Sequence, residues 1–344
     1  MAQWPLPRHD GYGTSYPPSD RAELTYHLGL KNATIENWIE IDDTYLDKYT
    51  LKKQLYTEHR NEVLAVLPGC DDASFEALNL LTQVLIRRYP TIFRFLDPDH
   101  LENLVTGDVW DLRPESSIWE KHHPLEVMGL LASDDFFLLY NDPSSGETKL
   151  KAGGACFPGM MIPYPSTSFI EQTLSSYKAG FKVEERIGLS LWEIHAGKVP
   201  QYESKLAKSM DRFFMRLKVG SVISRFNYAI DNSSELFLRN PHHNLTPEQL
   251  LGDPPMLEDL HLRVERQVLQ RLPKTRALLF SIRTYVTPIT KVTEDKEVAR
   301  ALRISVGSYT EDLDKYKNKV LWDATLQKHI AHVLGETPEV SVVA

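Results

Sequence analysis

The first quarter of the chain carries apolar residues at helical spacing. The segment 42–67 (DDTYLDKYTLKKQLYTEHRNEVLAVL) shows this spacing, and the aspartates at its start favour a helix N-terminus. A second such segment, 75–89 (FEALNLLTQVLIRRY), stops before Pro90, which cannot continue a helix. The pattern predicts that this part of the chain is mainly helical.

In the middle of the chain the pattern changes to period two. Segments 128–142 and 148–157 are predicted strands joined by the turn DPSSGE, and 221–231 and 276–286 alternate clearly. The apolar run LSLWEI (189–194) is also strand-like. These segments predict an antiparallel sheet of about five strands.

Further helices are predicted around this sheet. The segment 201–217 has a helical apolar stripe, and VERQVLQRL (264–272) has its apolar residues on one side of a short helix. Segments 294–304 and 311–335 close the chain with helices, and 160–182 resembles a loop with a short helix. The predicted class is therefore α+β, an antiparallel sheet flanked by N-terminal and C-terminal helices.

Two arginines stand in the middle of predicted strands. Alternation puts Arg225, and likewise Arg283, opposite the larger apolar set of its strand, so we expect both arginines on one side of the sheet. Solvent would account for a polar side, but Ile223, Leu279 and Tyr285 share it. A half-buried arginine needs a carboxylate or phosphate partner, and from the pattern a protein carboxylate serves as well as one from a ligand.

Two other residues are candidates for chemistry. His195 follows the run LSLWEI, where an imidazole could ligate a metal, act as a general base or hydrogen-bond the backbone. Glu265 lies between arginines and could form an ordinary surface salt bridge, hold a cationic amine or move a proton. The pattern alone favours the ordinary structural role for each residue, a backbone hydrogen bond for His195 and a salt bridge for Glu265.

Composition narrows the class of protein. The formal net charge of −8 disfavours a general nucleic-acid surface, and no apolar run reaches membrane-spanning length. The two cysteines, Cys70 and Cys156, cannot supply a four-cysteine metal site or a disulfide framework. The N-terminal residues lack the apolar core of a signal peptide, so we expect a cytoplasmic protein with neither nucleic acid nor membrane as partner.

Familiar catalytic and nucleotide-binding motifs are absent. The sequence has no nucleotide-binding glycine loop, no HExxH and no GxSxG.

Several stretches carry a family resemblance. In order along roughly residues 28–335, the chain resembles the α-subunit type of haem-dependent oxidative N-demethylase. The longest and most specific stretch is RVERQVLQRLPKTRALLFSIRTYVTPI (263–289). The other matching stretches are WIEIDDTYLDKY, LLTQVLIRRYPTIF, GGACFP, IGLSLWEIH, VPQYESKLAKSMDRFFMRLKVG and SRFNYAID.

This resemblance implies a PAS-like sheet that holds haem b. It implies one haem-binding domain over residues 26–335, between an irregular arm (1–25) and a tail (336–344). It makes His195 the axial ligand of the haem iron and Glu265 the catalytic carboxylate. The cofactor site would also include Arg225 and Arg283, as partners of the haem propionates, with Asn227 and Tyr285.

The activity implied by the resemblance is oxidative N-demethylation. Such an enzyme is a monooxygenase-type oxidoreductase that uses dioxygen to remove a methyl group from a small secondary amine, releasing formaldehyde. Electrons come from NADPH through flavin and iron–sulfur modules, which this two-cysteine chain lacks, so the resemblance implies a separate reductase partner.

The sequence departs from the family pattern near the expected iron ligand. It reads HAGKVP where the family has His-x-Pro-Val-Pro, residues 159–184 are longer than the family's link, and Tyr228 replaces a tryptophan. Two other functions therefore stay open. One is a non-catalytic haem or small-ligand sensor, and the other is an oxidase of specialised metabolism acting on a larger substrate.

Overall fold

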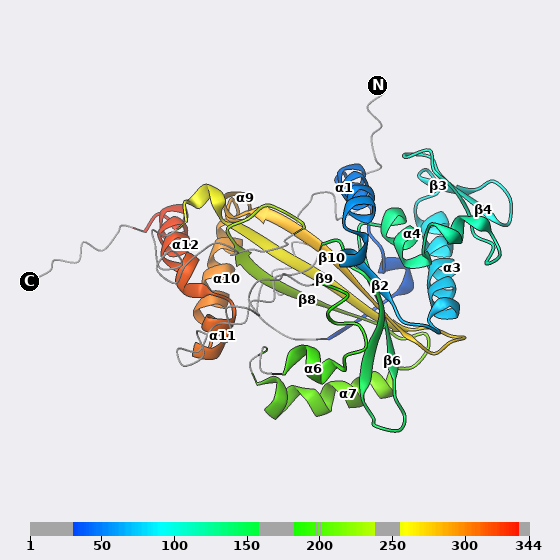
Figure 1. Cartoon of the computed structure of the whole chain (residues 1–344). Helices are drawn as coiled ribbons and strands as arrows, with labels where there is room; N and C mark the ends of the chain where they lie inside the picture. Colours follow the sequence, from blue (N-terminus) through cyan, green and yellow to red (C-terminus); the bar gives the residue numbers. More distant parts are fainter. Residues whose placement is uncertain (1–29, 158–181, 197–198, 200, 238–254, 337–344) are drawn as a thin grey trace, which may run out of the picture.

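The main feature of the fold is a large antiparallel sheet. The computed structural model describes residues 30–157, 182–196, 199, 201–237 and 255–336 (Figure 1). Within them, a seven-stranded sheet has the order β1-β8-β9-β10-β6-β7-β2, and a second sheet has the order β3-β4-β5. The α+β class is confirmed, and the expected five strands become seven in the large sheet. The expected arm, the loop predicted at 160–182 and almost all of the tail lie outside the described residues.

The strands of the large sheet are β1 (Lys31–Ala33), β2 (Leu64–Val66), β6 (Asp135–Asn141), β7 (Thr148–Gly154), β8 (Val222–Asp231), β9 (His261–Arg271) and β10 (Leu278–Pro288). Those of the small sheet are β3 (Phe93–Phe95), β4 (His100–Asn103) and β5 (Val109–Asp111). The N-terminal helical elements are η1 (Ile35–Asn37), α1 (Tyr45–Glu58), α2 (Arg60–Val63), α3 (Asp71–Arg88), η2 (Ser117–Glu120) and α4 (Pro124–Leu131). The later ones are α6 (Leu191–His195), η3 (Tyr202–Leu206), α7 (Ala207–Arg216), η4 (Leu257–Asp259), α9 (Ile289–Val292), α10 (Lys296–Gly307), α11 (Glu311–Tyr316) and α12 (Lys319–Leu334).

Four sequence predictions of element type were wrong in whole or in part. Residues 264–272 form most of strand β9, which pairs with β8 on one edge and β10 on the other, so nearly all of its side chains are buried. The run 189–194 was predicted as a strand, but Ser190 and Glu193 form a capping box that starts helix α6. The first part of 128–142 belongs to α4, and strand β6 begins only at Asp135. The predicted helix at 42–67 ends at Glu58, and α2 and β2 follow it.

The strand register assigns each side chain to one side of the sheet. Residues paired directly across antiparallel strands point to the same side. Arg225 pairs with Gln267, which pairs with Ile282; Phe226 pairs with Arg266, which pairs with Arg283. The two arginines of the sequence prediction therefore lie on opposite sides, because β9 lies between their strands and sets the register. We call the side with Arg225 the α6 side and the side with Arg283 the α1 side.

Helices cover both sides (Figure 1). On the α6 side, α6 and α7 pack on an apolar cluster that includes Phe137, Leu269 and Leu278. On the α1 side, Trp38 and the N-terminal helices pack on one half of the strands. The C-terminal helices α10 and α12 pack on the other half of that side, where Trp322 joins the cluster.

Candidate functional site

Glu265 lies in the middle of β9 on the α6 side, held by two carboxamides. Asn227 pairs with it from β8 and donates from Nδ2 to Glu265 Oε2 over 3.3 Å. Gln267, two residues along β9, donates from Nε2 to the same oxygen over 2.7 Å. No hydrogen bond joins the second oxygen, Oε1, to the part of the chain that the structure describes. One carboxylate oxygen is thus anchored, while the other is not used by these contacts.

A cation stands behind each carboxamide. Arg225 donates from Nε to Gln267 Oε1 over 2.6 Å. Lys317, in the turn between α11 and α12, donates from Nζ to Asn227 Oδ1 over 3.1 Å and to the Tyr228 carbonyl over 2.6 Å. Burial lowers the pKa of Lys317 to about 8, although the charge of Glu265 opposes this effect. The result is a hydrogen-bonded row from Lys317 to Arg225 with the carboxylate at its centre.

His195 ends helix α6 above the same side of the sheet. Its Nδ1 lies 2.7 Å from the Leu191 carbonyl oxygen, and its ring stacks on Tyr202 with the centroids 4.9 Å apart. Because a carbonyl only accepts, Nδ1 must carry the proton, which leaves the lone pair of the neutral ring on Nε2. A backbone bond of this kind is how proteins orient a metal-ligating histidine.

Haem is the group that the sequence resemblance implies, and these residues fit it. Apolar side chains on the α6 side, Ile223, Phe280 and Ile282, are only half-buried although they stand on inner strands. They are apolar neighbours of the polar row, since Ile282 stands beside Gln267, and Ile223 and Phe280 stand beside Leu269. His195 offers a ring nitrogen for iron, and Arg225 is a half-buried cation suited to a carboxylate.

Arg283 and Tyr285 lie on the other side of the sheet, away from this site. Arg283 is fully buried; its Nη2 donates to Asp42 Oδ2 over 2.5 Å, and its Nη1 is 3.8 Å from Asp134 Oδ2. Tyr285 donates to Glu40 Oε2 over 2.5 Å. The partners of Arg283 in the structure are therefore protein carboxylates, the alternative that the pattern had left open. The sequence prediction grouped these two residues with Arg225 because it took both arginines to be on one side.

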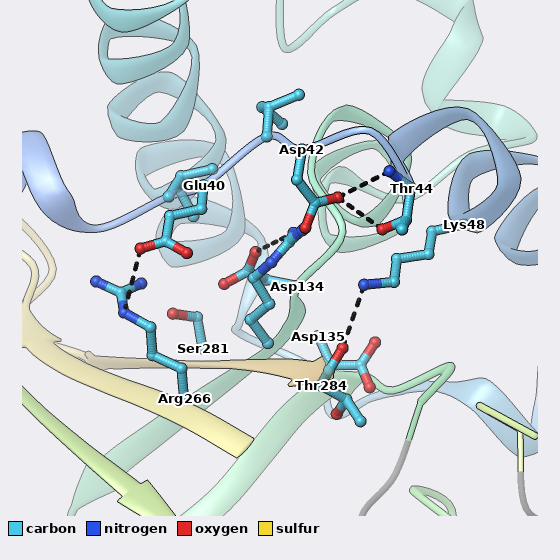
Figure 2. Close-up of polar contacts among 12 residues, drawn as sticks. Glu40, Asp42, Thr44, Lys48, Asp134, Asp135, Arg266, Ser281 and Thr284 are labelled. Carbon is cyan, nitrogen blue, oxygen red and sulfur yellow. Dashed lines mark hydrogen bonds and ion pairs between the residues drawn. The ribbon is translucent and has the colours of Figure 1, made fainter. Parts of the chain in front are cut away.

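This second polar group joins the N-terminal segment to the sheet (Figure 2). Glu40 faces Arg266 and Asp42 bonds Thr44, while Lys48 donates to the Thr284 carbonyl over 3.2 Å. Burial would raise the pKa of Asp42, but Arg283 and Lys48 hold it well below its usual range. Burial raises the pKa of Asp134 to about 6 and, together with Arg283, lowers that of Lys48 to about 7.

Sequence reasoning found Arg225, Asn227 and Glu265 and missed two members of their row. Gln267 follows Glu265 by two residues in the quoted stretch, so strand alternation would have placed it beside Glu265 had β9 been recognised as a strand. Lys317 lies in a charged segment, EDLDKYKNK, that gives no sign of burial.

Comparison with known families identifies the chain at the level of the family. No helix in the described ranges has the length and apolar character needed to cross a membrane. The family model described as haem-dependent oxidative N-demethylase, alpha subunit-like, matches residues 29–164 and 160–327. The chain belongs to the haem-dependent oxidative N-demethylase, alpha subunit-like family.

Proposed function

We propose that the chain binds haem b on the α6 side of a PAS-like sheet and oxidises a small secondary amine or a related nitrogenous metabolite. The observation that carries the proposal is the anchored carboxylate of Glu265 on the same side of the sheet as His195. The family description supports an oxidoreductase that depends on haem. Electrons would come from NADPH through a flavin and iron–sulfur reductase on a separate chain, and an alpha-subunit-like family is consistent with such a partner.

Each residue of the site has a role in this proposal. His195 would hold the iron through Nε2, and Arg225 would pair with a haem propionate. Bound haem would supply the activation of dioxygen and the oxidising power. Arg283 and Tyr285 are assigned to the α1 side, where they hold the N-terminal segment.

Glu265 is the proposed site of substrate binding and proton transfer. A protonated secondary amine carries a positive charge and two N–H donors, and a carboxylate with one anchored oxygen can accept one of them at Oε1. The same oxygen can take up the amine proton before the methyl group is oxidised. Because Asn227 and Gln267 donate only to Oε2, they hold the carboxylate without competing for the substrate.

The first test is the absorption spectrum of the purified chain reconstituted with haemin. We expect a Soret band that His195→Ala shifts or abolishes. His261→Ala is the control, because its Nδ1 also bonds a backbone carbonyl, that of Asp259, at the start of β9. Absence of a Soret band would contradict the haem proposal, and an unchanged band in His195→Ala would remove His195 as the ligand.

Turnover then separates an enzyme from a sensor. With a surrogate reductase, the haem-loaded chain should release formaldehyde from dimethylamine. Glu265→Gln should keep the Soret band and slow turnover about 100-fold or more, the usual effect of losing a general acid or base. Glu297→Gln, at an exposed carboxylate on α10, is the control. A Soret band without turnover on small or larger amines would favour a haem sensor.

A further inference from the structure

Lys317 brings the C-terminal helices into contact with the site. Among the described residues, β1 pairs only with Val222–Ser224 of β8, and no other described strand pairs with the rest of that edge. Lys317 reaches this edge, where its Nζ meets the Tyr228 carbonyl and Asn227 Oδ1. The side chain is buried, and its ammonium also lies near the rings of Tyr228 and Tyr316. A buried ammonium must be compensated by hydrogen-bond acceptors, because taking it out of water is costly, and here the acceptors belong to β8.

The contact decides which way the Asn227 carboxamide faces. An ammonium has only donors, so the carboxamide atom that it meets must be the oxygen. The opposite atom, Nδ2, then faces Glu265 as a donor. Without Lys317 the carboxamide can rotate by half a turn and present its oxygen to the carboxylate, replacing an attraction by a repulsion. Arg225 fixes Gln267 by the same logic, since its Nε meets Oε1 and leaves Nε2 for Glu265.

We propose that Lys317 is a positioning residue that holds the Asn227 carboxamide as a hydrogen-bond donor to Glu265. It acts through Asn227 and touches neither substrate nor cofactor. The charged groups that interact with Glu265 in the described part of the chain include Arg263 on its own strand and Lys317, and Arg225 on β8 is linked to it through Gln267. Thr284 pairs with Glu265 from β10 and adds a polar but uncharged neighbour. The proposal deepens the proposed function, and its main test does not depend on haem or turnover.

The test measures the proton on Glu265 by infrared spectroscopy of the full-length chain. The band of the protonated carboxyl is assigned as the one missing from Glu265→Gln, and its intensity is followed against pH. We expect Lys317→Met to move the appearance of this band to a pH about one unit higher, because a carboxylate that loses a donor and a nearby cation holds its proton more strongly. Lys317→Arg, which restores a cation with donors only, should return the midpoint toward that of the wild type.

A double-mutant cycle separates positioning from general stability. If Lys317 acts mainly through Asn227, Lys317→Met should shift the proton equilibrium of Glu265 less in an Asn227→Leu background than in the wild type, and what remains is the direct effect of its charge. Lys319→Met is the control, because Lys319 bonds the Val306 carbonyl and pairs with Asp314 rather than with a residue of the Glu265 row. An unchanged midpoint in folded Lys317→Met, or equal effects in both backgrounds, would overturn the proposal. If the infrared titrations of all variants are as expected but the haem-loaded wild type shows no turnover, the result would count against the proposed function and not against the role of Lys317.

Discussion

At the scale of single residues, the orientation of a buried polar side chain depends on all of its bonding partners, including the one that faces away from the site. Asn227 and Gln267 are carboxamides of the same kind as many on protein surfaces, and only the cation behind each one makes it a donor to Glu265. Burial makes these choices matter, since the energy of a polar contact grows when water is absent. The same holds for Lys48 on the α1 side, where burial and the charge of Arg283 outweigh the attraction of Asp42 and Asp134.

Lys48 should give the wild-type protein a pH-dependent stability that Lys48→Met lacks. The pKa of Lys48 is about 7 in the folded state, against 10.5 for an ordinary lysine. Between these values the unfolded chain binds more protons, so stability rises with pH. We expect the free energy of unfolding of the wild type, measured by urea denaturation, to gain up to about 1.4 kcal/mol per pH unit over Lys48→Met above pH ~7. Lys121→Met, at an exposed lysine, should run parallel to the wild type. A constant difference between wild type and Lys48→Met would contradict this prediction.

At the scale of elements, the sequence predicted best where one face of an element meets water. The α3 helix was readable because polar residues mark its outer face, while β8 and β10 alternate apolar and polar residues although β10 is largely buried. Strand β9 was not, because a central strand buried on both faces loses its period of two. That error also hid the register, and with it the fact that Arg225 and Arg283 lie on opposite sides. The start of α6 could have been found from the SLWE capping box.

The members of the site were likewise predictable only where a local sequence pattern marks them. Arg225, Asn227, Glu265 and His195 were proposed from strand alternation and family resemblance, and the structure places the first three of them in one hydrogen-bonded row. Lys317 could not be, because it is more than 50 residues from them in sequence and reaches β8 only through the packing of the C-terminal helices. A contact made by the fold between distant segments leaves no local pattern.

The packing of α1 against α4 depends on a glycine. A Cβ atom on Gly129 would lie 2.6 Å from the hydroxyl oxygen of Tyr56, which is far too close. We expect Gly129→Ala to lower the free energy of unfolding by about 1–3 kcal/mol through overpacking. In a Tyr56→Phe background the nearest ring atoms lie 3.4 Å from the Cβ position of residue 129, which is an ordinary contact. There Gly129→Ala should be neutral or should raise the free energy of unfolding by up to ~1 kcal/mol, because alanine favours a helix over glycine. Thermal denaturation of the four proteins gives both values.

The control for this cycle is Gly307→Ala. Gly307 ends α10 with nothing near its Cβ position, so no clash is expected there. An equal cost of Gly129→Ala in both backgrounds would show that the Tyr56 hydroxyl is not the cause.

At the scale of the molecule, three long strands connect the N-terminal and C-terminal helical layers. On the α1 side, β10 contributes Leu279 to the cluster of the N-terminal helices and Tyr285 to that of α10 and α12. The two helical layers therefore share these strands, and we expect both layers to unfold in one transition.

Leu326→Ala tests this expectation from the C-terminal layer. Leu326 is fully buried in α12, and its truncation should cost about 2–5 kcal/mol. Native-state hydrogen exchange followed by mass spectrometry should show an equal loss of protection in α1 and α12. Val320→Ala, at an exposed position of the same helix, should leave both unchanged. Loss of protection confined to α10–α12 would show that the two layers unfold separately.

The N-terminal segment across the α1 side also constrains how the protein is made. Trp38 donates to Ser281, Glu40 accepts from Tyr285, and Asp42 accepts from Arg283. The partners of these residues therefore lie more than 240 positions later in the sequence. A growing polypeptide cannot complete this part of its structure until β10 has left the ribosome. Contacts between such distant residues also slow folding, because a long loop must close before they form. Most of the chain therefore has to be synthesised with the apolar residues around Trp38 still unburied, which makes the nascent chain a natural client for chaperones.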